Sequence, residues 1–138
     1  LAGYGVFLAD GLIAFSSKLL KIVADSSCEA EYAACSLCAK ELKFVRGLLE
    51  DMGYPVVGSI VLGVDNTAAI DTALDVGVTK RNKHYERALH YIREEVACLR
   101  VFLVFVGTHL QMADIFTKAL AKTPLAVMMK YMYGKIGD

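Results

Sequence analysis

The feature that most constrains this sequence is one long stretch with helical periodicity, residues 26–52. It begins with Ser26 and Glu29 in the Ser-x-x-Glu spacing of a capping box, and it ends before Gly53. Small and apolar residues recur along one face at helical spacing: Cys35, Cys38, Leu42, Val45 and Leu49. A helix with such a stripe is stable when other elements pack against it. The rest of the chain must therefore provide a covering layer.

The flanking segments predict that layer as a mixed sheet. Apolar runs at 4–9 and 12–15 flank Asp10-Gly11 as in a β-hairpin, and further strands are expected at 21–24, 59–64 and 101–106. Helices are expected at 66–73, 83–98, 112–120 and 125–133. The order β-β-β-α-β-α-α-β-α-α predicts a single α/β domain over residues 1–138, with an antiparallel front and a strand-helix crossover.

Hydropathy excludes two classes of protein. Hydrophobic residues make up 56% of the chain, which excludes intrinsic disorder. The longest purely apolar run, residues 101–106, is far shorter than the roughly 20 residues of a membrane-spanning helix. We therefore expect a packed core and no membrane span.

Charge is balanced overall but not locally. The chain has 15 Lys and Arg against 15 Asp and Glu, so binding to nucleic acid would depend on a local basic patch. Basic residues concentrate between 80 and 93, around the single acid Glu86, and include Lys80, Arg81, Lys83 and Arg87. Such a patch can contact phosphates. The solvated start of a helix is an equally good interpretation from the sequence alone.

The positions of the four cysteines favour free thiols over disulfide bonds. Three of them, Cys28, Cys35 and Cys38, crowd into the long helical stretch, which favours a reduced, intracellular setting. The CxxC pair has no second pair or His partner to complete a zinc site. We interpret Cys35 and Cys38 as thiols of a helix core.

Glu31 is the unusual acid of the long helix. It falls on the apolar stripe. Burial of an unpaired carboxylate there would lower the stability of the fold by roughly several kcal/mol. It could equally serve the helix amino terminus as a first-turn acid. Glu29 lies roughly 200° around the axis, at about 100° per residue, so we expect it to face water.

Two further acids lie where they could join Glu31. Asp65 ends an apolar strand, at the end where open α/β sheets place ligand groups, although it could instead cap the helix that follows. Asp114 falls on the polar flank of a short amphipathic helix, where a solvated side chain is expected. Carboxylates that converge on one edge of a sheet repel one another unless cations neutralise them. Their oxygens suit Mg²⁺ or Mn²⁺.

Four motifs in a fixed order resemble the ribonuclease H domain of copia-type LTR retrotransposon polyproteins. They are residues 26–32 (SSCEAEY), 64–70 (VDNTAAI), Lys83-His84 with 90–94 (HYIRE), and 113–118 (ADIFTK). The resemblance covers nearly the whole chain. It implies an RNase H-like fold: a five-stranded mixed sheet with three antiparallel front strands, flanked by helices.

The resemblance also implies an activity. Glu31, Asp65 and Asp114 match three of the family's four acidic residues, which hold two divalent ions that hydrolyse the RNA strand of an RNA-DNA hybrid. His109 falls near the loop where relatives carry a histidine that assists proton transfer. The implied partners are the hybrid and the reverse transcriptase domain of the same polyprotein. The implied location is the cytoplasm, within a virus-like particle.

One departure leaves the activity open. The family's first acidic residue lies on a strand upstream of the Gly3-Tyr4 that begins the hairpin, so we expect this chain to be truncated at its amino end relative to the family. Loss of that central strand would leave two unpaired sheet edges. A catalytically inactive remnant and a hybrid-binding or connection module remain alternatives to the nuclease.

Overall fold

The computed structural model describes residues 1–20, 27–75 and 86–133. The expected strand at 21–24, the capping residue Ser26 and the basic residues Lys80, Arg81 and Lys83 lie outside these ranges. The described elements are β1 (Ala2–Leu8), β2 (Gly11–Lys18), α1 (Ser27–Asp51), β3 (Ile60–Val64), α2 (Thr67–Leu74), α3 (Glu86–Ala97), β4 (Val101–Phe105), two short 3₁₀ helices η1 (Thr108–Leu110) and η2 (Met112–Phe116), and α4 (Lys122–Met132).

The predicted hairpin is present, with its turn moved by one residue. β1 and β2 pair antiparallel, and the last pair is Leu8 with Gly11. The turn therefore consists of Ala9 and Asp10, both with positive φ, at 49° and 63°. Two such residues give a tight turn the twist that the strands require. Our placement of Gly11 within the turn was wrong, because its pairing with Leu8 extends β2.

β3 and β4 pair in parallel and provide the predicted strand-helix crossover. Their register runs from Ile60 opposite Val101 to Val64 opposite Phe105, and the connection between them contains α2 and α3. The α/β class, with antiparallel and parallel strands flanked by helices, is thereby confirmed. The described strands form two separate two-stranded sheets, β1-β2 and β3-β4. Each of these four strands therefore has a partner on one side only.

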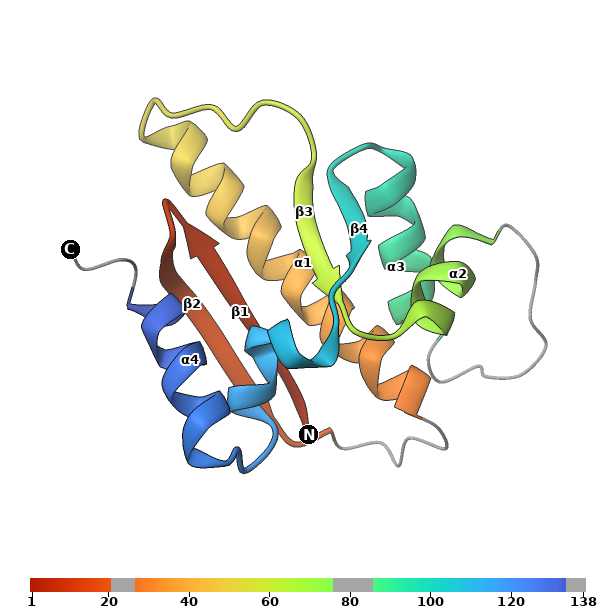
Figure 1. Ribbon diagram of the computed structural model, residues 1–138. Helices are drawn as coiled ribbons and strands as arrows, with labels where there is room; N and C mark the ends of the chain where they lie inside the picture. The colour runs from red at the N-terminus through yellow and green to blue at the C-terminus, as the bar shows by residue number, and fades with distance from the viewer. Residues whose placement is uncertain (21–26, 76–85, 134–138) are drawn as a thin grey trace.

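Helix α1 crosses both sheets and holds them together (Figure 1). Its predicted stripe is buried at Cys35, Cys38 and Leu42, where it contacts β1. Glu29, which we expected to face water, is only 3% exposed. The expectation was wrong because α2 and α3 cover this second side of the helix, as the ammonium of Lys40 over the Tyr91 ring illustrates.

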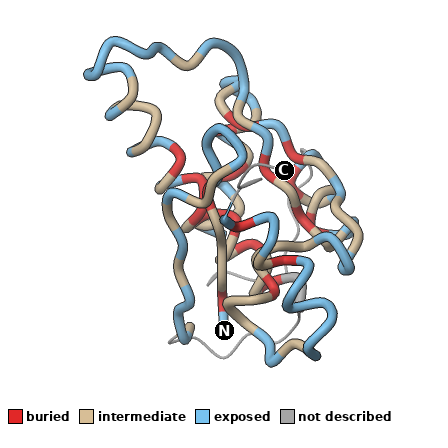
Figure 2. The backbone as a smooth tube through the Cα atoms, turned by 60° about the vertical axis from the view of Figure 1, so that its left-hand side comes forward, coloured by how far each residue is buried: buried red, intermediate tan, exposed pale blue. Residues whose placement is uncertain are grey.

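The buried residues gather where α1 meets the sheets. Figure 2 shows that the carboxyl end of α1 and its connection to β3 are mostly exposed, in contrast to the middle of the molecule. Leu62 and Val64 of β3 and Leu103 of β4 belong to the same core as the buried residues of α1. The core therefore fixes the carboxyl end of β3 against the amino-terminal half of α1.

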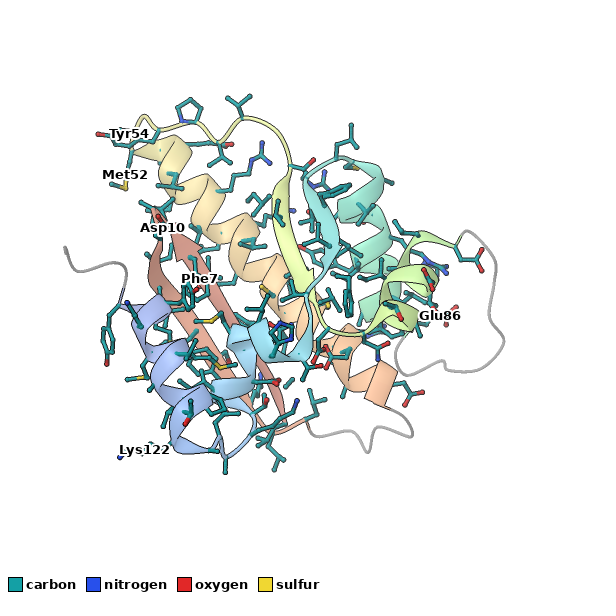
Figure 3. All side chains as sticks on the ribbon, viewed as in Figure 1. Phe7, Asp10, Met52, Tyr54, Glu86 and Lys122 are labelled. Atoms are coloured by element: carbon teal, nitrogen blue, oxygen red, sulfur yellow. The ribbon has the colours of Figure 1, made fainter. Side chains whose placement is uncertain are left out.

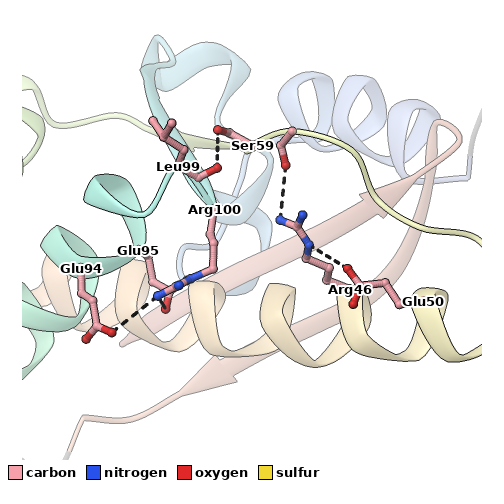
Figure 4. Close-up of polar contacts among 8 residues, drawn as sticks. Arg46, Glu50, Ser59, Glu94, Glu95, Leu99 and Arg100 are labelled. Atoms are coloured by element: carbon pink, nitrogen blue, oxygen red, sulfur yellow. Dashed lines mark hydrogen bonds and ion pairs between the residues drawn. The ribbon is translucent and has the colours of Figure 1, made fainter.

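Polar contacts fix the opposite end of the β3-β4 pair (Figure 4). Ser59 Oγ donates to the carbonyl of Leu99 at 2.6 Å. The Arg100 guanidinium donates to both carboxylate oxygens of Glu95, at 2.8 and 3.0 Å. This pairing satisfies a carboxylate that is only 2% exposed, and it lowers the pKa of Glu95. The two strands are thus anchored where they begin.

The segment after β4 departs from the predicted helix at 112–120. The chain instead forms η2, a 3₁₀ helix that ends at Phe116. The Phe116 ring stacks on Phe15 with ring centroids 5.0 Å apart, and its carbonyl accepts a hydrogen bond from Ser17 Oγ. That carbonyl is therefore engaged by β2 and does not continue a helical ladder. The final helix, expected at 125–133, begins three residues earlier at Lys122 and packs beside β2 (Figure 1).

Candidate active site

Three carboxylates from distant parts of the sequence border one cavity of about 470 Å³. Glu31 comes from the second turn of α1, Asp65 directly follows β3, and Asp114 belongs to η2. Residues of β1 and of β3 also line the cavity. The structure thus brings together the three acids that the sequence singled out.

Asp65 is available to the cavity because another residue caps the next helix. Asn66 Oδ1 accepts a hydrogen bond from the backbone N of Ala69 at 3.2 Å, so Asn66 is the N-cap of α2. The alternative in which Asp65 is the cap is therefore wrong. Asp65 is half-buried at the end of a core strand, a rigid position for a functional group.

Glu31 is not a first-turn residue. α1 begins at Ser27, and the acid of its first turn is Glu29, so the amino-terminal interpretation of Glu31 is wrong. Burial raises the pKa of Glu31, and the neighbouring charges of Asp65 and Asp114 raise it further, while Lys118 opposes them. The carboxylate thus lies in an environment that favours its neutral form unless a cation is near.

Asp114 is buried, contrary to the expected solvated position. It is 7% exposed because η2 packs against β1. Gly3 makes this approach close, since a Cβ added there would lie 2.5 Å from Thr117 Cγ2 and 3.4 Å from the carbonyl of Ala113. The close packing of η2 against β1 therefore positions Asp114 at the cavity wall.

Lys118 is the site residue that sequence reasoning missed. Its Nζ donates to Asp114 Oδ1 at 2.9 Å. This hydrogen bond, with the charges of Asp114, Asp65 and Glu31, raises the pKa of Lys118. The available signal was the spacing Asp114-x-x-x-Lys118, which places the two side chains close together in a helical turn. A cationic group therefore already lies among the three acids.

The oxygen donors of the three acids suit a divalent ion, but the arrangement of the acids in this structure does not form a metal site. Carboxylate oxygens are the donors that Mg²⁺ and Mn²⁺ prefer. Among residues 1–20, 27–75 and 86–133, however, no three His, Cys, Asp or Glu side chains are grouped so that they could hold a metal ion. The chemistry of the set fits a divalent ion, whereas the arrangement in this structure pairs Asp114 with an ammonium instead.

The other predicted site residues do not line the cavity or fall outside the described residues. His109 is exposed in η1, with its ring beside Gly107, and it does not line the cavity. Arg87 is exposed on the first turn of α3. Lys80, Arg81 and Lys83 fall within residues 76–85, which the structure does not describe.

Two thiols form part of the cavity wall. Cys35 and Cys38 are buried on α1, as the interpretation of helix-core thiols predicted, and they are free. Burial raises the pKa of each thiol to about 12, and the charge of Glu31 contributes at Cys35. Both are therefore protonated and weakly nucleophilic at neutral pH.

Comparison with known proteins identifies relatives for nearly the whole chain. It is 35% identical over 121 residues to the retrovirus-related Pol polyprotein from transposon RE1 of Arabidopsis thaliana. It is also 35% identical over 120 residues to that from transposon RE2 of the same plant, and 32% identical over 120 residues to that from transposon TNT 1-94 of Nicotiana tabacum. No protein-family model and no solved structure matches the chain.

These alignments cover 87–88% of the chain but only 8–9% of each polyprotein. By sequence, the chain is therefore homologous to a short segment of retrovirus-related Pol polyproteins from transposons.

Within the residues that the structure describes, no helix has the length and apolar character needed to cross a membrane.

Proposed function

We propose that this chain is the ribonuclease H segment of a copia-type retrotransposon Pol polyprotein. It hydrolyses the RNA strand of RNA-DNA hybrids formed during reverse transcription. The observation that carries the proposal is that Glu31, Asp65 and Asp114, brought from three elements, border one cavity at the carboxyl end of β3. Homology to Pol polyproteins supports the biological setting.

The three acids have distinct contributions in this proposal. Mg²⁺ or Mn²⁺ held by Glu31, Asp65 and Asp114 would supply an acidified water and charge stabilisation for hydrolysis of a phosphodiester. Asp65 provides a fixed carboxylate, because its strand is anchored in the core. Glu31 provides a carboxylate whose ionisation depends on nearby positive charge.

Residues outside the cavity complete the proposed site. Arg87, with Lys80, Arg81 and Lys83, contacts the phosphates of the hybrid, which makes binding weaken as salt increases. His109 assists proton transfer from the exposed η1 segment. Recognition depends on hybrid shape and 2′-hydroxyl groups, with little reading of bases. The proposed partner in the polyprotein is the reverse transcriptase domain, and the proposed location is the cytoplasmic virus-like particle.

A cleavage assay with a labelled RNA-DNA hybrid and Mg²⁺ tests the proposal. Asp65→Asn should abolish cleavage, because it removes one charge from the site and leaves the shape of the side chain nearly unchanged. Asp71→Asn is the matched control, since Asp71 is exposed on α2 and does not line the cavity. Cleavage that survives Asp65→Asn would exclude the proposed site.

A second candidate function is a non-catalytic module that binds hybrid or connects polymerase regions. It is favoured by the Lys118–Asp114 ion pair, which engages one of the three acids. Fluorescence anisotropy with the same hybrid separates the two functions. Binding without cleavage in the unmodified chain would support the non-catalytic module, whereas cleavage sensitive to Asp65→Asn supports the nuclease.

A further inference from the structure

Unbroken runs of residues from two strands line the carboxylate cavity. They are residues 2–7 of β1 and residues 60–63 of β3, and Phe7 lies near the carboxyl end of β1 (Figure 3). Successive side chains of a strand point to opposite faces, so an unbroken run is expected where a cavity meets the edge of a strand. β2 and β4, which are described in full and are the partners of β1 and β3, contribute no residue to the lining. The cavity therefore lies between the unpaired edges of β1 and β3.

These two edges present backbone groups that no strand pairs. The N–H and C=O groups of a strand point to both sides, and β1 and β3 each form a ladder on one side only. β1 and β3 run in opposite directions (Figure 1). One extended chain between them would pair antiparallel with one strand and parallel with the other. It would thereby join the two sheets into one.

Helix α1 provides an apolar wall for the cavity. It contacts both β1 and β3, and most of its lining residues are small or apolar: Ala30, Ala34, Cys35, Cys38 and Leu42. The two thiols have pKa values raised to about 12, so they add no charge to this wall at neutral pH. Side chains of an inserted strand that face α1 must therefore be apolar, and they occur at every second residue.

A peptide of defined length fits these features. β1 has seven residues and β3 has five, so a strand that pairs with both spans five to seven residues. The chain corresponds to only 8–9% of the related Pol polyproteins, so most of such a polyprotein lies outside the aligned segment. A strand from that remaining part has a high effective concentration at the cavity, because it belongs to the same molecule.

We propose that the cavity is the acceptor site for an extended segment of the Pol polyprotein. The segment adds a strand of five to seven residues between β1 and β3, with main-chain hydrogen bonds to both edges. Its apolar side chains, at alternate positions, pack against α1. The inference goes beyond the proposed nuclease and depends neither on cleavage nor on a bound metal ion.

Peptide binding to the whole chain tests this role. The probes are overlapping dodecapeptides that cover the polyprotein of transposon RE1, screened on an array and then measured by fluorescence anisotropy. We expect one group of overlapping peptides to bind through a shared segment with apolar residues at alternate positions. Proline at the centre of that segment should weaken binding roughly tenfold or more, because proline cannot donate to a strand ladder.

Hydrogen exchange measured by mass spectrometry locates the bound peptide. With the peptide at about ten times its Kd, exchange of the edge amides should slow by about tenfold. The effect should occur in both β1 and β3, because the inserted strand pairs with both edges.

Two neighbouring alanines of α1 provide matched variants. Ala34 lines the cavity and Ala33 does not, and both are half-buried. Ala34→Phe places a ring in the cavity and should lower the peptide affinity roughly tenfold or more, whereas Ala33→Phe should leave it unchanged. The melting temperature of each variant shows whether it folds. Ala30→Phe also enlarges a lining residue and provides the test if Ala34→Phe does not fold.

The outcomes separate this inference from its alternatives. Absence of binding by every peptide overturns it, and so does equal peptide affinity in the wild type and Ala34→Phe. Slower exchange in only one of β1 and β3 also overturns it, because the peptide would then not lie between them. A dimer of the chain that Ala34→Phe dissociates would assign the cavity to a second copy instead of the polyprotein segment. None of these measurements uses RNA cleavage, so this inference and the nuclease proposal can fail separately.

Discussion

Replacement of Gly3 by alanine tests how η2, and with it Asp114, is placed. An added Cβ would lie 2.5 Å from Thr117 Cγ2 and 3.2 Å from Phe116 Cβ. Ordinary carbon contacts lie at roughly 3.5–4.0 Å, so η2 or β1 must yield by about 1 Å. Overpacking of this kind costs roughly 1–3 kcal/mol, and the smaller entropy of the unfolded alanine chain offsets about 0.4–1 kcal/mol of that.

We therefore expect Gly3→Ala to lower the free energy of unfolding by about 1.3 kcal/mol, the difference between the midpoints of the two ranges. Urea denaturation followed by circular dichroism measures it, and each kcal/mol corresponds to roughly 3–5 °C in Tm for a chain of this size. The variant should also bind Mn²⁺ less tightly than the wild type if the acids are its ligands, since η2 carries Asp114.

Gly47→Ala is the matched control. Gly47 lies within α1, and an added Cβ there would have no neighbour within 4 Å. Alanine at that position should stabilise the fold by roughly 0.5–1 kcal/mol through helix propensity. The same substitution is thus expected to have opposite signs at the two sites.

A double-mutant cycle identifies the clash. Thr117→Ser removes the methyl group that the new Cβ would meet and keeps a hydroxyl for its bond to the Asp114 carbonyl. Combined with Gly3→Ala, it should recover part of the lost stability, a coupling of about 0.5 kcal/mol or more. Gly3→Ala as stable as the wild type, or a cycle without coupling, would refute the packing argument.

Three further predictions follow from the hairpin, the acids and the thiols. Ala9→Gly should stabilise the fold by roughly 1 kcal/mol in urea denaturation, because Ala9 has a φ of 49°, and a neutral effect would contradict strain at that turn. The pKa of Glu31 is higher in the folded protein than its ordinary value of 4.5, so the fold loses stability as the pH rises from 4.5 through the pKa of the folded state. Glu31→Gln should therefore be more stable than the wild type at neutral pH and equal to it below pH 4.5. A stability difference independent of pH would count against this. Cys98 is exposed and should react with iodoacetamide in the native state, whereas Cys35 and Cys38, with pKa values near 12, should react only on unfolding, as mass spectrometry of the labelled protein would show.

Local sequence determined the elements whose signals are short in range. The hairpin around Asp10 and the strand that ends just before Asp65 follow from turn residues and apolar runs, and both are present. The position of Asp65 after a core strand was therefore predictable, and the structure added that Asn66 caps the following helix. These features depend on neighbours a few residues away, so the sequence contains the relevant information.

Tertiary structure decided which polar groups are buried. Glu29 was assigned to the solvent because one helix shows one apolar stripe, but α2 and α3 cover its other side. η2 is short because Phe116 is held by Phe15 and Ser17, which lie about a hundred residues earlier in the sequence. Helical periodicity does not record such contacts.

The position of Lys118 among the acids depends both on local sequence and on tertiary structure. Its i,i+4 relation to Asp114 is local and could have been read from the sequence. Its interaction with Glu31 and Asp65 required three elements to meet at one cavity. Electrostatic interactions depend on distances through space, and the fold alone sets those distances for residues that are far apart along the chain.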